Sequence, residues 1–348
     1  MGKVLLACLV ALAAALIMTP VAKWLAPKVG AIDKPNARKV HSRLMPRMGG
    51  LGIYAGFVAA LLVYFGFSRE IMGLLVSSSL VFAVGIVDDI KGVSPGVKLL
   101  GQVAAAVIFI ACGGYIKYLT NPIGGDIIFL DYWGIPVTLL WLVGISNAVN
   151  LIDGLDGLAG GVSAIAAITM AIVAFSTGYN TAAVLAIFLV FALIGFLRYN
   201  FSPAQIFMGD SGSLFLGFTL AALAIMGFAK GATMISLVIP VLILGIPIFD
   251  TFFAIARRYQ EGKPIFQADK GHLHHRLLAI GLSHKQTVVI IYAITMFMGV
   301  AAILLTLISS AQAVLILFII LLISLIGARR LGVLHGAGNK KNQKAEGK

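Results

Sequence analysis

The chain has 348 residues, of which 60% are hydrophobic and only 11% charged, and its mean hydropathy is +1.03. Soluble domains carry roughly 25% charged residues, so the composition excludes an ordinary soluble protein. The net charge of +13 could indicate nucleic-acid binding, but the positions of the basic residues argue against it. No low-complexity linker or fixed-period repeat divides the chain, which predicts one membrane domain.

Apolar stretches long enough to cross a bilayer recur throughout the chain. One helical crossing needs about 20 apolar residues, and open strand edges would leave backbone groups unpaired in lipid. We predict an all-α polytopic membrane protein with about eleven transmembrane helices, at 4–25, 49–67, 71–87, 98–116, 133–149, 158–177, 181–197, 213–228, 232–256, 286–308 and 311–328.

These spans organise the chain into one domain and a tail. Residues 1–328 are predicted to form a single transmembrane catalytic domain, and 329–348 a basic, disordered cytoplasmic tail. The first span resembles a signal peptide, but Lys23 and Trp24 behind it favour a retained helix with an interfacial anchor. The segment 124–133 alternates weakly and predicts a small hairpin outside the membrane.

Basic residues fall on one side of the predicted spans. Of the 26 lysines and arginines, all but Lys3, Arg69, Lys117 and Lys230 lie in alternate loops or in the tail. Positive charge marks the cytoplasmic face, so the N-terminus is predicted outside and the C-terminus in the cytoplasm. Topology and anionic lipid headgroups thus explain the net charge, and no nucleic-acid partner is expected. Most acidic residues also lie in or near the cytoplasmic loops, which predicts that the protein carries out its function at the cytoplasmic face.

The aspartate pair Asp88-Asp89 ends the third predicted span. Adjacent carboxylates repel each other and are costly in hydrocarbon, so the pair indicates a site for a cation or a phosphate group. A solvated helix end with Lys91 as counter-ion is the alternative. That alternative is weakened because a helix C-terminus disfavours acids.

The stretch NAVNLIDGLDGLAGG at 147–161 combines asparagines, aspartates and glycines. Asp153 and Asp156 are three residues apart and would share a helix face, and Asn147 and Asn150 precede them. The glycines allow backbone to approach a ligand closely. Simple turns and helix caps also use Asx-Gly pairs, and they are the alternative interpretation.

The motif FMGDSGS places Asp210 just before the eighth predicted span. Asp210 either caps that helix or binds Mg²⁺, which prefers oxygen ligands. Phe207 is either an interfacial anchor or a face on which a flat base stacks. Asp250 lies inside the ninth predicted span. A buried acid there is either functional or an ion-pair partner of Arg257 or Arg198.

The motif HLHH supplies three histidines beside Arg276, namely His272, His274 and His275. Clustered imidazoles can bind Zn²⁺, but the surrounding basic residues favour an anion such as phosphate, with a solvated basic loop as the alternative. Carboxylates for Mg²⁺, cations for phosphates and glycine-rich backbone together predict phosphoryl transfer at the membrane surface.

Five motifs of the chain, in their order and in their positions on the loops, resemble those of the polyprenyl-phosphate N-acetylhexosamine-1-phosphate transferases, glycosyltransferase family 4. The motifs are DKPNARKVH, GIVDDI, NAVNLIDGLDGLAGG, FMGDSGSLFLGF and HLHHRLL. The resemblance covers nearly the whole chain. It favours the bacterial undecaprenyl-phosphate N-acetylglucosamine-1-phosphate transferases, because Leu273 interrupts the histidine triplet of the phospho-MurNAc-pentapeptide branch.

The resemblance implies transfer of N-acetylglucosamine 1-phosphate from UDP-GlcNAc to undecaprenyl phosphate, giving undecaprenyl-diphosphate-GlcNAc and UMP. Mg²⁺ is the implied cofactor, and Mn²⁺ could substitute. The reaction would initiate synthesis of a cell-envelope polysaccharide of the teichoic acid or O-antigen type. A multi-pass protein of the plasma or inner membrane would carry the active site on the cytoplasmic face. A homodimer is also implied, because related enzymes form dimers.

The resemblance also implies roles for individual residues. Phe207 would stack on uracil, and Asp153 and Asp156 would line the uridine pocket. The catalytic set is Asp88, Asp89, Asp156, Asp210 and His274. The substrate-binding set is Arg43, Lys98, Asn147, Asn150, Asp153, Phe207, His272, His275 and Arg276. The implied metal ligands are Asp210 and Asn150.

Three rival functions stay open at the level of sequence. A phospho-MurNAc-pentapeptide transferase of peptidoglycan synthesis is the alternative within the family. A transporter would show intramembrane charges at the midplane and matching broken helices, whereas the polar residues here gather at one face. A CDP-alcohol phosphotransferase would continue its aspartate-glycine motif into Ala-Arg, but no arginine follows 147–161 before Arg198.

Overall fold

The computed structural model describes residues 2–33, 44–120, 127–228, 238–262 and 271–307, with Gln312 and Ile319. The predicted Arg43 site residue, nearly all of the predicted span 311–328 and the tail 329–348 lie outside these residues. Within them the chain is predominantly helical, and seven helices are long and apolar enough to cross a membrane. The predicted class of all-α membrane protein is therefore confirmed, while the count of eleven spans and the orientation of the termini stay predictions.

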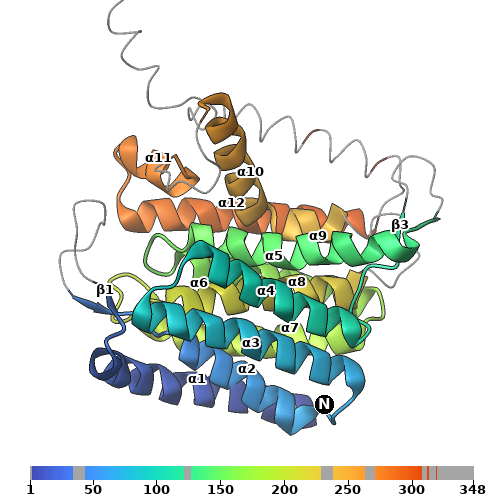
Figure 1. Cartoon of the computed structure of the whole chain (residues 1–348), viewed down its shortest axis with the longest axis horizontal. Helices are drawn as coiled ribbons and strands as arrows, with labels where there is room; N and C mark the ends of the chain where they lie inside the picture. Colours follow the sequence, from blue (N-terminus) through green and yellow to red (C-terminus); the bar gives the residue numbers. More distant parts are fainter. Residues whose placement is uncertain are drawn as a thin grey trace, which may run out of the picture.

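The helices up to the site-forming α8 run back and forth along one direction (Figure 1). In chain order they are α1 (Gly2–Val29), α2 (Gly50–Tyr64), α3 (Arg69–Lys91), α4 (Pro95–Ala111), α5 (Gly134–Ile152), α6 (Leu158–Ser176), α7 (Asn180–Asn200) and α8 (Gly209–Phe228). The apolar helices α2 and α4 are the shorter ones, with 15 and 17 residues. This alternation brings the ends of α3, α5 and α7 together with the starts of α4, α6 and α8.

The remaining helices are less regular. They are α9 (Val238–Ile243), α10 (Gly245–Gln260), α11 (Leu273–Ala279) and α12 (His284–Leu305). The sequence predicts one continuous span over 232–256, but the helix breaks at Leu244, between α9 and α10. Pro247 explains the break, because it has no N–H to donate to the carbonyl of Ile243. Beyond it, α10 leaves the bundle at a steep angle to α12 (Figure 1).

Two small hairpins lie at opposite ends of the bundle (Figure 1). β1 (Ile32–Asp33) pairs antiparallel with β2 (Met45–Pro46) beside the end of α1. At the other end, β3 (Tyr118–Thr120) pairs antiparallel with β4 (Ile127–Phe129), followed by a 3₁₀ turn at Asp131–Trp133. The hairpin predicted at 124–133 is thus present, although its first strand lies earlier in the chain.

The helix α8 is the centre of the fold, and every residue from Gly209 to Gly227 is buried. A helix that is apolar on all sides is stable only when neighbours cover it all round. Two glycines let neighbouring helices come close to its start: a Cβ at Gly50 would clash with the backbone of Gly212, and a Cβ at Gly85 with the backbone of Ser211. Small residues at such contacts allow helix backbones to approach closely in membranes.

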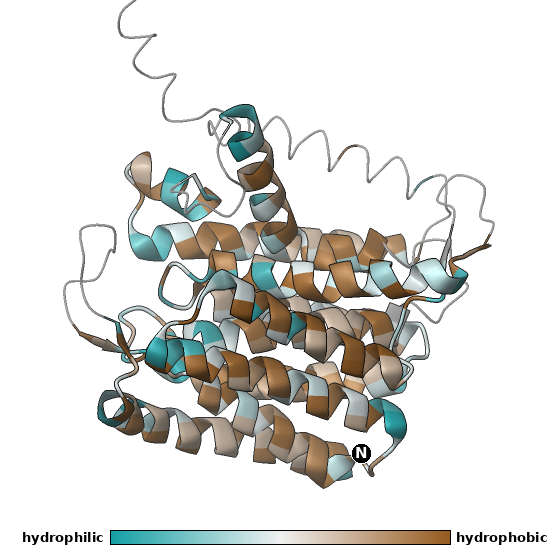
Figure 2. Cartoon of the chain, viewed as in Figure 1, coloured by the Kyte–Doolittle hydropathy of each residue, from teal (hydrophilic) through white to brown (hydrophobic). Residues whose placement is uncertain are grey.

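The hydropathy of the residues differs between the length of the bundle and its ends. Figure 2 shows apolar ribbon along the length of the bundle, with hydrophilic ribbon prominent at the end of α3 beside β1, on α11 and at the tip of α10. Hydrophilic ribbon is thus prominent at the bundle end that carries β1, although the start of α3, at the other end, is hydrophilic too (Figure 2).

Candidate functional site

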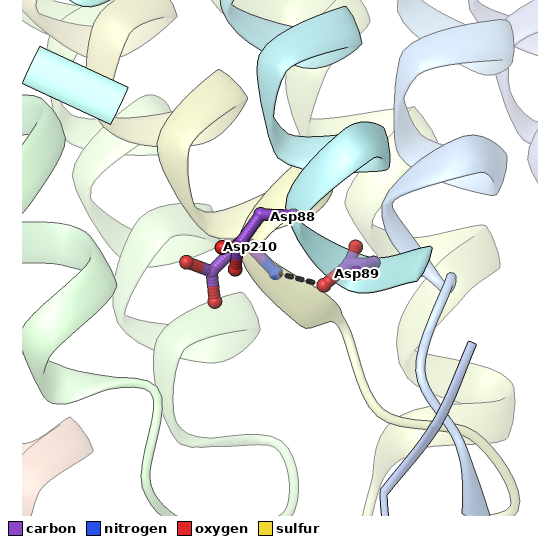
Figure 3. Close-up of side chains that lie close together, drawn as sticks. All are labelled: Asp88, Asp89 and Asp210. Carbon is purple, nitrogen blue, oxygen red and sulfur yellow. Dashed lines mark hydrogen bonds between the residues drawn. The ribbon is translucent and has the colours of Figure 1, made fainter. Parts of the chain in front are cut away.

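Three aspartates from two helices meet at the bundle end that carries β1 (Figure 3). Asp88 and Asp89 come from the last turn of α3, and Asp210 from the first turn of α8. Each can offer one oxygen such that the three atoms lie within 4.8 Å of one another, and all three residues are buried. Residues 121 positions apart in sequence thus form one acidic cluster.

Both carboxylate oxygens of Asp89 accept hydrogen bonds from the start of α8. Its Oδ1 accepts the N–H of Asp210 at 2.8 Å, and its Oδ2 accepts the N–H and the hydroxyl of Ser211 at 3.0 and 2.6 Å. A carboxylate is favourable at a helix N-terminus, where N–H groups lack partners inside the helix. Gly209 makes room for it: φ is +77° there, and a Cβ would lie 2.5 Å from Asp89 Oδ2.

Two cations form ion pairs with the acidic cluster. Lys98 Nζ lies 2.9 Å from Asp88 Oδ2 and 2.5 Å from Asp210 Oδ2. Arg47 contacts Asp210 Oδ1 through Nη2 at 2.5 Å and Asp89 Oδ1 through Nε at 3.2 Å. A charge removed from water needs such partners. The side chains of Arg47 and Lys98 remain 32% and 24% exposed, so both cations also face solvent.

Arg47 was not among the site residues predicted from sequence. Its backbone forms a parallel bridge with Phe207, reinforced by the N–H of Phe207 donating to Pro46 O and that of Gly49 to Phe207 O, both at 2.9 Å. This pairing of two loops brings Arg47 to the start of α8. The signal in the sequence was its place in MPRMGG, three residues before Gly50, which packs against the start of α8.

Asn150 and Ser213 join the site from α5 and α8. Asn150 Nδ2 donates to Ser213 Oγ at 2.8 Å, and Ser213 Oγ donates to Gly209 O at 3.0 Å. Because the hydroxyl has one proton and gives it to the carbonyl, it must accept from the amide, which fixes the orientation of Asn150. The oxygen of Asn150 is then the atom it can offer to a ligand.

A cavity of about 560 Å³ opens beside the acidic cluster. Nucleotide-sized ligands occupy pockets of roughly 300–1,000 Å³. The cavity is lined by Asp33, Arg47, Asn150, Asp153, Gly154, Leu155, Asp156, Asn200, Phe207, Met208, Gly209, Asp210, His275 and His284.

The loop between α5 and α6 forms one wall of this cavity. Asp156 Oδ2 accepts the N–H of Ala204 at 3.0 Å, so this carboxylate ties the loop to the segment before α8. Gly157 adopts φ +75°; its N–H donates to Asn200 Oδ1 at 3.1 Å, and its carbonyl accepts the hydroxyl of Tyr292 at 2.5 Å. The loop is therefore held by α7 and α12.

Asp153 directly follows α5, where it is half-buried and lines the cavity. Burial and then the negative charge of Asp210 raise the pKa of the Asp153 carboxyl to about 7. Near neutral pH this group therefore exists in both protonation states.

The histidines of HLHH stand against the same loop. A Cβ at Gly154 would lie 2.5 Å from His274 Nε2, so the imidazole rests on the loop backbone. Burial and then His275 lower the pKa of His274 to about 3, which keeps it neutral at pH 7. His275 lines the cavity with His284, a residue not predicted from sequence, whereas His272 and His274 are buried.

Other predicted site residues lie elsewhere. Asn147 Nδ2 donates a hydrogen bond of 2.7 Å to Oε1 of the buried Gln102, and Asn147 does not line the cavity. Arg276 lies half-buried in α11, directly after His275, and is also outside the cavity lining. The structure thus brings most of the predicted residues to one cavity and its acidic floor.

The oxygen donors present suit a hard divalent ion. Such ions prefer carboxylate and carbonyl oxygens, which Asp88, Asp210 and Asn150 provide. Asp89 suits this role less, because both of its oxygens already accept hydrogen bonds from α8.

Comparison with known proteins identifies the family of the chain. The sequence model of a family described as glycosyl transferase family 4 matches residues 71–228. The chain is 42% identical over 336 residues to the probable undecaprenyl-phosphate N-acetylglucosaminyl 1-phosphate transferase of Bacillus subtilis, covering 96% of this chain and 94% of that protein.

Two more distant relatives point the same way. A decaprenyl-phosphate N-acetylglucosaminephosphotransferase of Mycobacterium tuberculosis is 37% identical, over 84% of this chain and 80% of its own length. An undecaprenyl-phosphate alpha-N-acetylglucosaminyl 1-phosphate transferase of Escherichia coli is 28% identical, over 78% and 75%. With an acidic cluster, its cations and a nucleotide-sized cavity at one end of a membrane bundle, the chain belongs to glycosyl transferase family 4, among the polyprenyl-phosphate N-acetylglucosamine-1-phosphate transferases.

Proposed function

We propose that the protein transfers N-acetylglucosamine 1-phosphate from UDP-GlcNAc to undecaprenyl phosphate, at the cytoplasmic face of the plasma membrane. The observation that carries the proposal is the pair Asp88 and Asp210, bridged by Lys98. Asp210 also lines a cavity large enough for a nucleotide sugar. The lipid acceptor and the transferred group come from the names of the relatives, and the UDP donor from the family resemblance of the motifs. The product would start a cell-envelope polysaccharide.

The donor would lie along the cavity. Phe207 offers an aromatic face for uracil, and Asp153 with the backbone at Gly154 offers polar groups to the nucleotide or the sugar. Arg47 and Lys98 would hold the diphosphate, because they carry the exposed positive charge beside Asp210. A guanidinium matches phosphate oxygens in a planar fork.

The reaction needs little proton transfer. A phosphate monoester has a second pKa near 6, so the lipid phosphate is largely deprotonated at neutral pH. One of its oxygens attacks the β-phosphorus of UDP-GlcNAc, the bond from that phosphorus to the bridging oxygen breaks, and UMP leaves with the oxygen. Asp88 would orient the attacking phosphate, and Lys98 would offset the charge of two anionic substrates. Catalysis is then mainly positioning and neutralisation of charge.

Mg²⁺ is the proposed cofactor, with Asp88, Asp210 and the oxygen of Asn150 as the residues that would hold it. When bound, the ion supplies positive charge to the diphosphate, and Mn²⁺ accepts the same oxygen ligands.

The direct test uses purified protein, radiolabelled UDP-GlcNAc, undecaprenyl phosphate and Mg²⁺. We expect lipid-linked label and an equal amount of UMP. A chain that produced neither would contradict the transferase function and favour a transporter. UDP-GalNAc and UDP-MurNAc-pentapeptide, supplied in parallel, should give little product, and preference for the latter would assign the chain to peptidoglycan synthesis.

The metal role has its own test. Asp210→Asn should lower turnover by about 100-fold or more, as removal of one key electrostatic group does in other enzymes, and should weaken Mn²⁺ binding measured by electron paramagnetic resonance. Loss of a helix cap alone costs only about 1 kcal/mol of stability. A folded Asp210→Asn variant with full activity and unchanged Mn²⁺ affinity would overturn the assignment.

A further inference from the structure

Asp250 is a buried acid that lies outside the cavity. It sits in α10, the helix that leaves the bundle, and its side chain is only 3% exposed. Its carboxylate reaches α11, 22 residues later in the chain. A buried carboxylate is retained only with good hydrogen-bond partners, so the atoms that Asp250 contacts indicate its role.

Both carboxylate oxygens bind the start of α11. Oδ1 accepts the N–H of Leu273 at 2.8 Å, and Oδ2 lies 2.7 Å from His272 Nδ1. An ionised carboxylate can only accept hydrogen bonds, so the proton of a neutral His272 must be on Nδ1, and Nε2 carries the lone pair. Asp250 thus sets both the first turn of α11 and the tautomer of His272.

The histidine rings connect this contact to the cavity. The ring of His272 is nearly parallel to that of His274, with centroids 5.9 Å apart, and His275 follows at 4.2 Å from His274. His274 rests on Gly154, and His275 lines the cavity. A shift of α11 would therefore move two imidazoles relative to the loop that carries Asp153 and Asp156.

We propose that Asp250 is a positioning residue of the transferase site, which fixes the tautomer of His272 and the start of α11 and thereby holds His274 and His275 against the donor cavity. The inference rests on the proposed function, because its catalytic consequence is measured as sugar-phosphate transfer.

Asp250→Asn tests the inference with little change in shape. Its oxygen can still accept from Leu273, but its NH₂ would face Nδ1 and favour the opposite tautomer of His272. We expect kcat/KM for UDP-GlcNAc to fall about 10- to 100-fold, the range found when partners of metal-bound histidines are changed, with a raised KM for UDP-GlcNAc and an unchanged KM for the lipid. Asp250→Glu, which keeps the charge and both acceptors, should recover part of the loss. Gln260→Ala, at the exposed end of α10, is the matched control and should retain full activity.

A double-mutant cycle distinguishes an effect of Asp250 that acts through His272 from an independent effect on the protein. Because Asp250 acts through His272, Asp250→Asn should cost little further activity in a His272→Gln background. If the two losses multiply in full, the two residues act independently and the inference is wrong.

The tautomer of His272 can be measured directly in the wild-type protein by nuclear magnetic resonance. In ¹⁵N-histidine-labelled protein, the His272 resonance, assigned by its loss in His272→Gln, should show a protonated Nδ1, and Asp250→Asn should move the proton to Nε2. A proton on Nε2 in the wild type, or wild-type kinetics in Asp250→Asn, would overturn the inference. A wild-type chain that transfers no sugar phosphate would instead refute the proposed function, whatever the resonance shows.

Discussion

Asp88 and Asp89 are neighbours in the chain, yet their carboxylates contact different partners. Asp89 accepts hydrogen bonds from the first residues of α8, and its side chain is fully buried. Asp88 accepts the N–H of Val93 and contacts Lys98. The geometry therefore separates a residue that anchors a helix from one that belongs to the charged floor of the site.

This difference predicts distinct variants. Asp88→Asn should lower kcat about 100-fold or more with little change in melting temperature, because the side chain keeps its shape. Asp89→Ala should also destabilise the protein, since each buried donor left without a partner costs about 1–3 kcal/mol.

Thermal unfolding in detergent, measured beside turnover, distinguishes the two variants. For Asp89→Ala we expect a melting temperature lower by about 4 °C or more. Equal melting temperatures for both variants would contradict the anchoring role of Asp89.

The carboxyl of Asp153 predicts a pH dependence of donor binding. Its pKa is raised to about 7, so below that pH the group is neutral and above it negative. The added charge should repel the diphosphate of UDP-GlcNAc, so the KM for this donor should rise between about pH 7 and 8.

Asp153→Asn keeps a neutral side chain at every pH. It should therefore flatten the KM profile, measured at saturating Mg²⁺ and lipid. An unchanged slope in this variant would assign the pH dependence to another group.

At the scale of elements, glycines decide how closely α8 approaches its neighbours. A Cβ at Gly85 would clash with the backbone of Ser211, and a rigid helix start cannot yield as a flexible side chain would. The same contact positions Asp89 at the start of α8. Packing of α3 against α8 and assembly of the acidic cluster are thus one structural feature.

Gly85→Ala should displace α8 and lower both stability and turnover, with at least a 10-fold loss of kcat, because catalytic groups tolerate shifts of only about 0.5 Å. Gly144→Ala is the control, since a Cβ there meets open space; in a helix it should be neutral or stabilise by about 0.5–1 kcal/mol. Detergent melting curves and initial rates measure both effects, and equal behaviour of the two variants would contradict the packing argument.

At the scale of the whole molecule, the two ends of the bundle differ. Arg47, Lys98 and the three aspartates lie at the end with β1, while β3, β4 and the exposed Tyr132 and Trp133 lie at the other (Figure 1). Aromatic residues are typical of membrane interfaces, and basic residues of the cytoplasmic side. Because aromatic residues occur at both membrane interfaces, only the basic residues favour the predicted orientation.

Cysteine labelling tests this orientation. In a Cys8→Ala, Cys112→Ser background, Tyr132→Cys should react with a membrane-impermeant maleimide in intact cells, because Tyr132 is 89% exposed at the predicted outer end. Lys91→Cys, exposed at the site end, should react only after permeabilisation. The reverse pattern would invert the predicted topology.

Much of the site could be predicted from sequence, because motifs are local. Asp88, Asp210, Asn150, Asp153 and Phe207 stood out by residue type and neighbours. Asn147 also fitted its motif, but its helix faces Gln102 instead of the cavity. A one-dimensional motif does not define which side of a helix faces the cavity, because that depends on the rotation of the packed helix.

By itself the sequence determined the membrane class, the apolar helices, the asymmetry of charge and the family motifs, since these depend on composition and short spacings. Tertiary structure alone decided the partnerships: Asp89 with the start of α8, Asp250 with His272, and Arg47 with Asp210, which lies 163 residues away. The physical reason is that a hydrogen bond requires donor and acceptor within about 3 Å. Only the packing of distant helices, with glycines at their contacts, brings these atoms that close.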